Sequence, residues 1–118
     1  MTVEPADRTR FVQVTLGVLG GKWKLLILWH IRSQPRRFSE LKRLIPQISE
    51  KILIQQLRDL EKDEIVHRND HAEVPPRVDY SFTEHGESLK PVLETLCKWG
   101  EAHLKQTEIE MPNRDSSF

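Results

Sequence analysis

The chain has 118 residues, of which 37% are hydrophobic, and its 18 lysines and arginines balance 18 aspartates and glutamates. This length supports one domain with one core and leaves little room for a catalytic domain beside a cofactor domain, so a multi-domain enzyme is excluded. The longest apolar run, residues 25–29, is far shorter than the roughly 20 residues that cross a bilayer, and the N-terminus lacks the apolar segment of a secretory signal. With one cysteine, we expect a cytoplasmic protein that has no disulfide and no cysteine-based zinc site.

The first part of the chain is predicted to form two helices. Apolar residues between Phe11 and Leu19 recur at helical spacing and stop at Gly20 and Gly21, which predicts a short helix that ends there. Residues 22–32 are apolar on most sides, which is typical of a helix surrounded by the rest of a domain. We therefore expect a central core helix after the glycine pair.

Two short helices and a tight turn are predicted next. Ser39 is suited to cap a helix that runs to residue 44 or 45, because its hydroxyl can accept a hydrogen bond from a first-turn amide, and Pro46 prevents continuation. Ser49 opens a second helix that reaches about Lys62, with leucines 53, 57 and 60 on its buried side. This pair has the layout of a helix-turn-helix.

After residue 62 the apolar spacing changes from about four to two. Residues 65–68 and 77–82 are predicted as the strands of a hairpin around an irregular loop at 69–76. Thr83 is expected to cap a final helix. Pro91 should either bend this helix or shift its effective start. Residues 108–118 show no periodicity and are predicted to be a flexible C-terminal tail, so the folded domain covers residues 10–107.

The predicted fold class is mainly α with a small β-hairpin wing, a winged helix-turn-helix of α+β type. Residues 22–58 hold nine basic and two acidic residues, a net charge of +7 that suits a polyanion such as DNA. The predicted base-reading residues lie on the second helix of the pair: Ser49, Lys51, Ile54, Gln55 and Arg58. The predicted contacts to the DNA backbone flank it: Lys22, Arg36, Arg37, Ser39, Lys42, Arg43, His71 and Arg77.

The same residues are compatible with other interpretations. The basic block is also compatible with a solvated helical face, and a winged helix can serve as a protein-interaction module without DNA specificity. Arg77 can instead pair with Asp70 or Glu73. His67 and His71 are four residues apart, but they fall on a strand and in a loop without further ligands, so we expect no metal and no cofactor. No nucleophile elbow, phosphate loop or paired carboxylates support an enzyme.

Several motifs, in order and without large gaps, carry a resemblance to a known family. They are Gly20-Gly21-Lys22-Trp23-Lys24, Arg37-Phe38-Ser39-Glu40-Leu41, Ile48-Ser49-Glu50-Lys51, Glu73-Val74-Pro75-Pro76-Arg77-Val78 and Pro91-Val92-Leu93. From about Thr15 to Gly100 the chain resembles the HxlR-type winged-helix transcription regulators, relatives of the MarR group. The resemblance implies a dimeric DNA-binding regulator, with repression favoured, whose reading helix enters a major groove and whose wing follows the backbone.

A homodimer is predicted to form through the last helix with help from the first, which demands an inverted-repeat operator. The predicted interface residues are Phe11, Val14, Leu93, Leu96, Trp99 and Leu104. Redox-sensing relatives usually carry a cysteine at the position that the resemblance assigns to Arg10, so we expect no thiolate switch there. Cys97 is predicted to be shielded by apolar neighbours. Trp23 and Trp29 are predicted as core residues, with a cavity for a small-molecule effector as the alternative.

Overall fold

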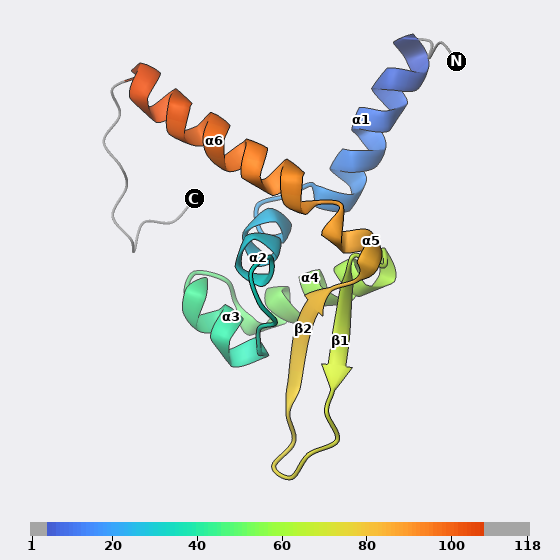
Figure 1. The fold of residues 1–118 in the computed structure, drawn as a ribbon, viewed down its shortest axis with the longest axis vertical. Helices are drawn as coiled ribbons and strands as arrows, with labels where there is room; N and C mark the ends of the chain where they lie inside the picture. Colours follow the sequence, from blue (N-terminus) through green and yellow to red (C-terminus); the bar gives the residue numbers. More distant parts are fainter. Residues whose placement is uncertain (1–4, 108–118) are drawn as a thin grey trace.

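The computed structural model describes residues 5–107, with side chains from Asp7 onward. The elements in chain order are α1 (Pro5–Leu19), α2 (Lys24–Ile31), α3 (Phe38–Leu44), α4 (Glu50–Lys62), β1 (Val66–Asp70), β2 (Val78–Phe82), α5 (Glu84–Glu87) and α6 (Lys90–Thr107). Figure 1 shows α2, α3 and α4 as a central body, the β1/β2 hairpin projecting from one side, and α1 and α6 projecting from the other. The predicted mainly helical fold with a hairpin wing is confirmed. The predicted tail, residues 108–118, lies outside the described residues.

The core of the body forms where α2, α3 and α4 meet. Ile27 and Leu28 of α2 and Leu41 of α3 are fully buried, and they pack in one cluster with the α4 residues Leu53 and Leu57. Leu60 is also fully buried, so the predicted inward stripe of α4 is confirmed. The opposite side of α4 is therefore free to face solvent along its whole length.

The two helices of the predicted pair start differently from one another. The Ser49 hydroxyl accepts the N–H of Ile52 at 3.1 Å, which confirms this residue as the cap of α4. The predicted Ser39 cap is wrong, because α3 begins at Phe38 and Ser39 lies inside its first turn. The carboxylate of Glu40 instead accepts the backbone N–H of Arg37 at 2.9 Å and so satisfies the start of this helix.

The wing is an antiparallel hairpin in which Val66 pairs with Phe82 and Asp70 with Val78. Its first strand starts one residue later and ends two residues later than predicted. The backbone of Arg36 adds a bridge to its second strand: the Arg36 N–H donates to the Tyr80 carbonyl at 2.9 Å, and the Tyr80 N–H donates to the Arg36 carbonyl at 2.8 Å. This bridge ties the wing to the segment that enters α3, which sequence periodicity did not reveal.

The predicted final helix is two helices. Thr83 caps only α5, accepting the Gly86 N–H at 2.9 Å, and α6 starts anew at Lys90 with Pro91 in its first turn. Proline fits a first turn because it has no N–H to donate, so the predicted shift of the helix start is confirmed and the single helix is wrong.

The projecting helices α1 and α6 pack against the body at one end, and the rest of each helix is mostly exposed to solvent. Leu19 and Leu93 are the buried apolar side chains of these helices among residues 7–107. Two predictions fail for this reason: Leu93 belongs to the core of a single chain and is not available to a partner, and Cys97 is exposed instead of shielded. Periodicity identified the apolar stripe of α6 but not the length of it that the body covers.

Among the described residues, no single helix is long and apolar enough to cross a membrane. Helices α1 and α2 meet the length and composition criteria only as a pair, Asp7–Leu19 with Lys24–Ile31, and the chain bends by 75° between them.

Candidate nucleic-acid interface

The outward side of α4, together with its cap Ser49, carries all five predicted base-reading residues. Lys51, Gln55 and Arg58 are exposed on the side away from the buried leucines, and Ile54 is 41% exposed beside them. A shallow hollow of about 950 Å³ follows this side and is lined by Ser49, Glu50, Lys51, Ile52, Ile54, Gln55 and Arg58. Within residues 7–107, neither Lys51 nor Arg58 has a side-chain partner, so both are free to meet an external anion or base edge.

The side chain of Gln55 is held in place by another side chain of α4. Its Nε2 donates to Asp59 Oδ1 at 3.0 Å, one helical turn further on. The other oxygen of Asp59 lies 3.8 Å from the ammonium of Lys24, which reaches over from α2. Sequence reasoning missed Asp59, although the spacing of four residues on a helix was a signal that could have found it.

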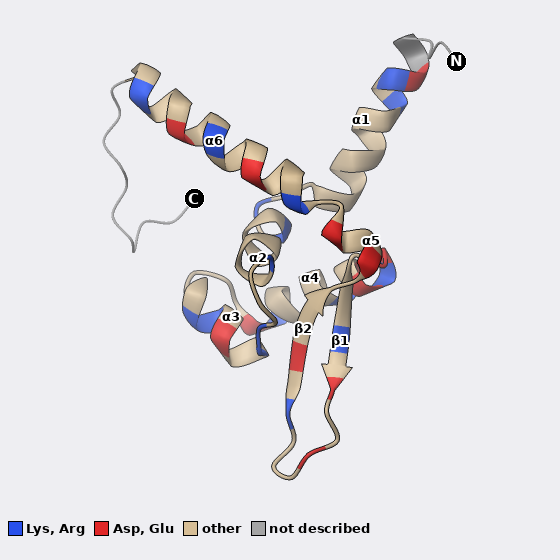
Figure 2. Ribbon diagram, viewed as in Figure 1, with Lys and Arg blue, Asp and Glu red and all other residues tan. Residues whose placement is uncertain are grey.

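The surface around α3 holds several of the cations that were predicted to contact the DNA backbone. Figure 2 shows lysines and arginines on α3 and on the segment that precedes it. Arg37 and Arg43 are exposed, and so is Ser39 in the first turn. The ammonium of Lys42 donates to the Pro46 carbonyl at 3.2 Å, which places its charge at the turn before α4. Lys22 lies at the start of the body, with its ammonium 4.6 Å from the centre of the Trp23 ring.

Three of the nine basic residues in the block are used inside the protein. Lys24 faces Asp59, and Arg32 faces Glu94 with Nε 3.2 Å from the carboxylate. Arg36 donates from Nε to the His30 carbonyl at 2.8 Å, and its side chain is 18% exposed. The Arg36 side chain therefore joins the segment before α3 to the end of α2. The positive charge that is available to a polyanion is smaller than the net charge of +7 counted from the sequence.

Arg32 and Arg36 also affect His30, and Arg32 contacts Trp29 of α2. Burial first, and then the charges of Arg36 and Arg32, lower the pKa of His30 from its ordinary value of 6.5. The Arg32 guanidinium lies 3.3 Å from the centre of the Trp29 ring. Trp23 and Trp29 are both half-buried against the core, in agreement with their prediction as core residues.

The two predicted wing contacts are engaged within the hairpin. His71 Nε2 lies 2.8 Å from Asp79 Oδ2, and Arg77 Nη2 lies 3.4 Å from Glu73 Oε1, which is the alternative partner considered for this arginine. Arg68 of β1 is exposed and, within residues 7–107, has no side-chain partner. This free cation of the wing was missed because it sits in a strand that was read only for its apolar residues.

Asp79 is the acceptor at the centre of the hairpin. Its partial burial would by itself raise its pKa, but hydrogen bonds from Asn69 and His71 outweigh that effect. The charges of His71 and Arg77 add to them, and the pKa of Asp79 lies below its usual value. Within the hairpin, Asp79 and Glu73 thus take up His71 and Arg77.

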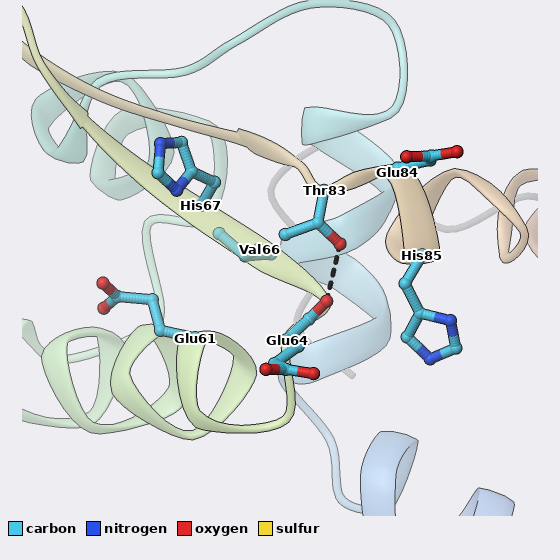
Figure 3. Close-up of a pocket in the computed structure, with 7 residues that line it drawn as sticks. All are labelled: Glu61, Glu64, Val66, His67, Thr83, Glu84 and His85. Carbon is cyan, nitrogen blue, oxygen red and sulfur yellow. Dashed lines mark hydrogen bonds between the residues drawn. The ribbon is translucent and has the colours of Figure 1, made fainter.

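A second hollow, of about 720 Å³, lies where the wing meets α4 and α5. Its lining comprises Glu61, Glu64, Val66, His67, Thr83, Glu84 and His85. Figure 3 shows His67 and His85 on opposite sides of Thr83, pointing apart, while the Thr83 hydroxyl donates to the Glu64 carbonyl at 2.5 Å. Within the described part of the chain, no three histidine, cysteine, aspartate or glutamate side chains are grouped to hold a metal ion. The titratable groups here do not form a converging site.

Apart from the buried Leu93, the predicted dimer residues lie on the parts of α1 and α6 that extend beyond the body. Phe11 and Val14 are 57% and 58% exposed, and Leu96 and Trp99 are 48% and 66% exposed. Leu104 is half-buried, and the Trp99 ring stacks on His103 with 4.9 Å between ring centres. Exposed apolar side chains gathered on two projecting helices are typical of a surface that another protein covers.

Comparisons with known proteins agree with this architecture. The chain is 52% identical over 98 residues to the HTH-type transcriptional regulator YkvN of Bacillus subtilis (strain 168), with 83% of each chain covered. The crystal structure of the HTH-type transcriptional regulator YtcD matches with a TM-score of 0.76 and 48% identity, over 80% of this chain and 96% of that chain. A MarR-family regulator from Enterococcus faecalis V583 matches with a TM-score of 0.76 and 34% identity, over 92% and 96%. Residues 18–108 match the HxlR-like helix-turn-helix profile. The chain belongs to the HxlR-like helix-turn-helix family of transcriptional regulators.

Proposed function

We propose that this regulator is a sequence-specific DNA-binding homodimer that recognises an inverted-repeat operator and represses transcription from it. The observation that carries the proposal is the outward side of α4, where polar and basic side chains stand opposite a fully buried leucine stripe. The protein acts in the cytoplasm, where the DNA that it reads lies. The similarity to transcriptional regulators supports a regulator and not an enzyme.

The side chains on α4 have the chemistry for reading bases in a major groove. Glutamine can pair bidentately with adenine and arginine with guanine, which assigns Gln55 and Arg58 to base edges. Lys51 suits guanine or phosphate, Ser49 can contact a base or phosphate at the helix start, and Ile54 can meet the methyl group of thymine. These five residues are the proposed reading face.

Contacts to the sugar-phosphate backbone are assigned to cations that flank α4. Arg37, Arg43 and Lys42 of the α3 region hold their charge at the surface. Ser39 is exposed in the first turn of α3, and Lys22 is exposed before α2. On the wing, Arg68 is a stronger candidate than Arg77 or His71, because those two already pair with carboxylates. Such contacts position the protein on any duplex and carry little sequence information.

The dimer is assigned to the exposed apolar residues of α1 and α6. Burying Phe11, Val14, Leu96 and Trp99 against a second copy would remove a large apolar surface from water. A two-fold dimer would place two reading helices roughly 34 Å apart, one turn of DNA, and would match an inverted repeat.

A selection experiment tests this function. The full-length protein is used to enrich duplexes from a randomised pool, and the affinity for an enriched duplex is compared with that for a shuffled duplex across a salt titration. We expect an enriched inverted repeat, a specific affinity well above the non-specific one, and affinity that falls with salt. Equal affinity for both duplexes at every salt concentration would favour the protein-interaction module instead.

Two variants then separate reading from positioning. Gln55→Ala is expected to lose roughly 1 to 3 kcal/mol of discrimination between the enriched and shuffled duplexes. Lys42→Ala should weaken binding to both by a similar factor, because a phosphate contact is independent of sequence. Repression is tested by in vitro transcription from a promoter that overlaps the enriched site, with a promoter that lacks the site as control.

A further inference from the structure

The side chain of Gln55 has its orientation set by two neighbours. Its Nε2 lies 3.0 Å from Asp59 Oδ1, and Asp59 Oδ2 lies 3.8 Å from Lys24 Nζ. The Lys24 side chain is only 12% exposed, so it is held between α2 and α4 and cannot leave the carboxylate easily. Asp59 is thus anchored on one oxygen to the core helix and offers the other oxygen to Gln55.

A carboxylate fixes the orientation of a neighbouring amide, whereas a second amide would not. Ionised Asp59 can only accept hydrogen bonds, whereas the Gln55 amide has an accepting oxygen at one corner and a donating NH2 at the other. Turning the amide over would place Oε1 of Gln55 against an oxygen of Asp59, which leaves two acceptors facing each other. The NH2 group of Gln55 therefore faces Asp59, and Oε1 is directed away from it.

This orientation has a consequence for base recognition. With one N–H of Nε2 bonded to Asp59, the amide still offers one N–H and its oxygen side by side, which matches the N7 acceptor and N6 donor of adenine. Guanine presents two acceptors at the same edge, N7 and O6, and an amide with a fixed oxygen cannot donate to both.

We propose that Asp59 is a positioning residue that fixes the Gln55 amide and thereby selects adenine over guanine at the base that Gln55 contacts. This inference rests on the proposed function, because it requires α4 to read DNA. Asp59 itself needs no contact with the base. As a negative charge on the DNA-facing helix it lowers affinity for every duplex, so its role shows in the ratio between bases and not in affinity itself.

The test uses the full-length protein and the inverted repeat enriched from randomised duplex DNA. The base pair read by Gln55 is identified as the position at which Gln55→Ala loses its preference. Duplexes with each of the four base pairs there are then titrated with wild type, Asp59→Asn and Glu61→Gln. Asp59→Asn keeps size and hydrogen bonding but can donate or accept, so both amide orientations become available. Glu61→Gln is the matched control, because it removes a carboxylate from the same helix without touching Gln55.

We expect Asp59→Asn to reduce the preference for adenine over guanine at that position about tenfold, within the range of a bidentate base contact. Preferences at the other operator positions should stay at their wild-type values, which a merely structural role of Asp59 would not predict. In a Gln55→Ala background, Asp59→Asn should leave the base preference unchanged, because the side chain that it positions is absent.

The same experiments distinguish a failure of the Asp59 positioning role from a failure of the proposed function. If Gln55→Ala loses the preference but Asp59→Asn keeps it, the positioning role is overturned while the proposed function stands. A loss of preference that is equal at all positions, or equal in Glu61→Gln, would also overturn it, because the effect would then be general electrostatics. If no duplex is enriched at all, the proposed function fails, and the inference fails with it.

Discussion

Gly86 lies at the joint between the wing and α6, and replacing it with alanine should destabilise the protein strongly. A Cβ atom at this position would lie 2.1 Å from the Ile65 carbonyl oxygen and 3.0 Å from Cδ1 of Phe82. The carbonyl cannot simply turn aside, because it accepts the Thr83 N–H at 3.0 Å. Helix α5 must therefore move away from the base of β1 by about 1 Å to restore an ordinary contact.

The magnitude follows from the contacts that this movement breaks. Overpacking a buried site costs about 1 to 3 kcal/mol, and weakening the hydrogen bond from the Gly86 N–H to the Thr83 hydroxyl, 2.9 Å in the wild type, adds about 1 kcal/mol. We expect the free energy of unfolding to fall by about 2 to 4 kcal/mol. For a domain of this size, that corresponds to a melting temperature about 8 to 16 °C lower.

Urea unfolding followed by circular dichroism, at one fixed protomer concentration, measures the change. Gly17→Ala is the matched control: Gly17 is a helical glycine with no atom within 4 Å of the added Cβ, so alanine should raise stability by about 0.5 to 1 kcal/mol. A Gly86→Ala protein within about 0.5 kcal/mol of wild type would refute the close approach between α5 and β1.

Three further predictions concern other parts of the molecule. Glu64 has a φ of 60°, a backbone conformation that costs a non-glycine residue about 1 kcal/mol. Glu64→Gly should therefore raise the free energy of unfolding by about that amount in urea titrations. A lower free energy of unfolding in this variant would contradict the account. Trp99→Asp should shift the protein from dimer to monomer in sedimentation velocity, because it places a charge in the proposed interface, whereas Lys105→Asp on the outer part of α6 should leave the assembly unchanged. The lowered pKa of His30 means that the unfolded chain binds a proton first as pH falls below 6.5, so stability decreases there, and His30→Gln should reduce the loss measured between about pH 7 and about pH 5.5. An identical pH dependence in this variant and the wild type would count against that role of His30.

Local patterns in the sequence were enough to predict the reading helix and the wing. The leucines at 53, 57 and 60 recur at the helical period, and Ser49 stands directly before them, so both the buried side and the start of α4 follow from neighbouring residues. The apolar residues after residue 62 recur with a period of two, and this pattern also depends on neighbouring residues, so it predicted the hairpin. Because the buried side of α4 was known, its outward residues could be named from the sequence alone.

Tertiary structure decided how these elements use their charged and apolar residues. Arg32 pairs with Glu94, 62 residues away, and the Arg36 side chain donates to the His30 carbonyl while the Arg36 backbone bridges to Tyr80. The sequence alone therefore could not separate either arginine from the basic block. Ser39 lost its predicted role as a cap because that bridge holds the preceding backbone extended up to Arg37, and α3 then begins one residue before Ser39.

The tertiary structure also determined which residues of α6 are buried. The apolar period identifies a stripe on α6, but only its packing shows that Leu93 lies under the body while Leu96, Cys97 and Trp99 lie beyond it. Periodicity reports which side chains share a face of one helix, since it depends on neighbours along the chain. Which part of that face is covered depends on distant segments, and these are brought into contact only when the whole chain folds.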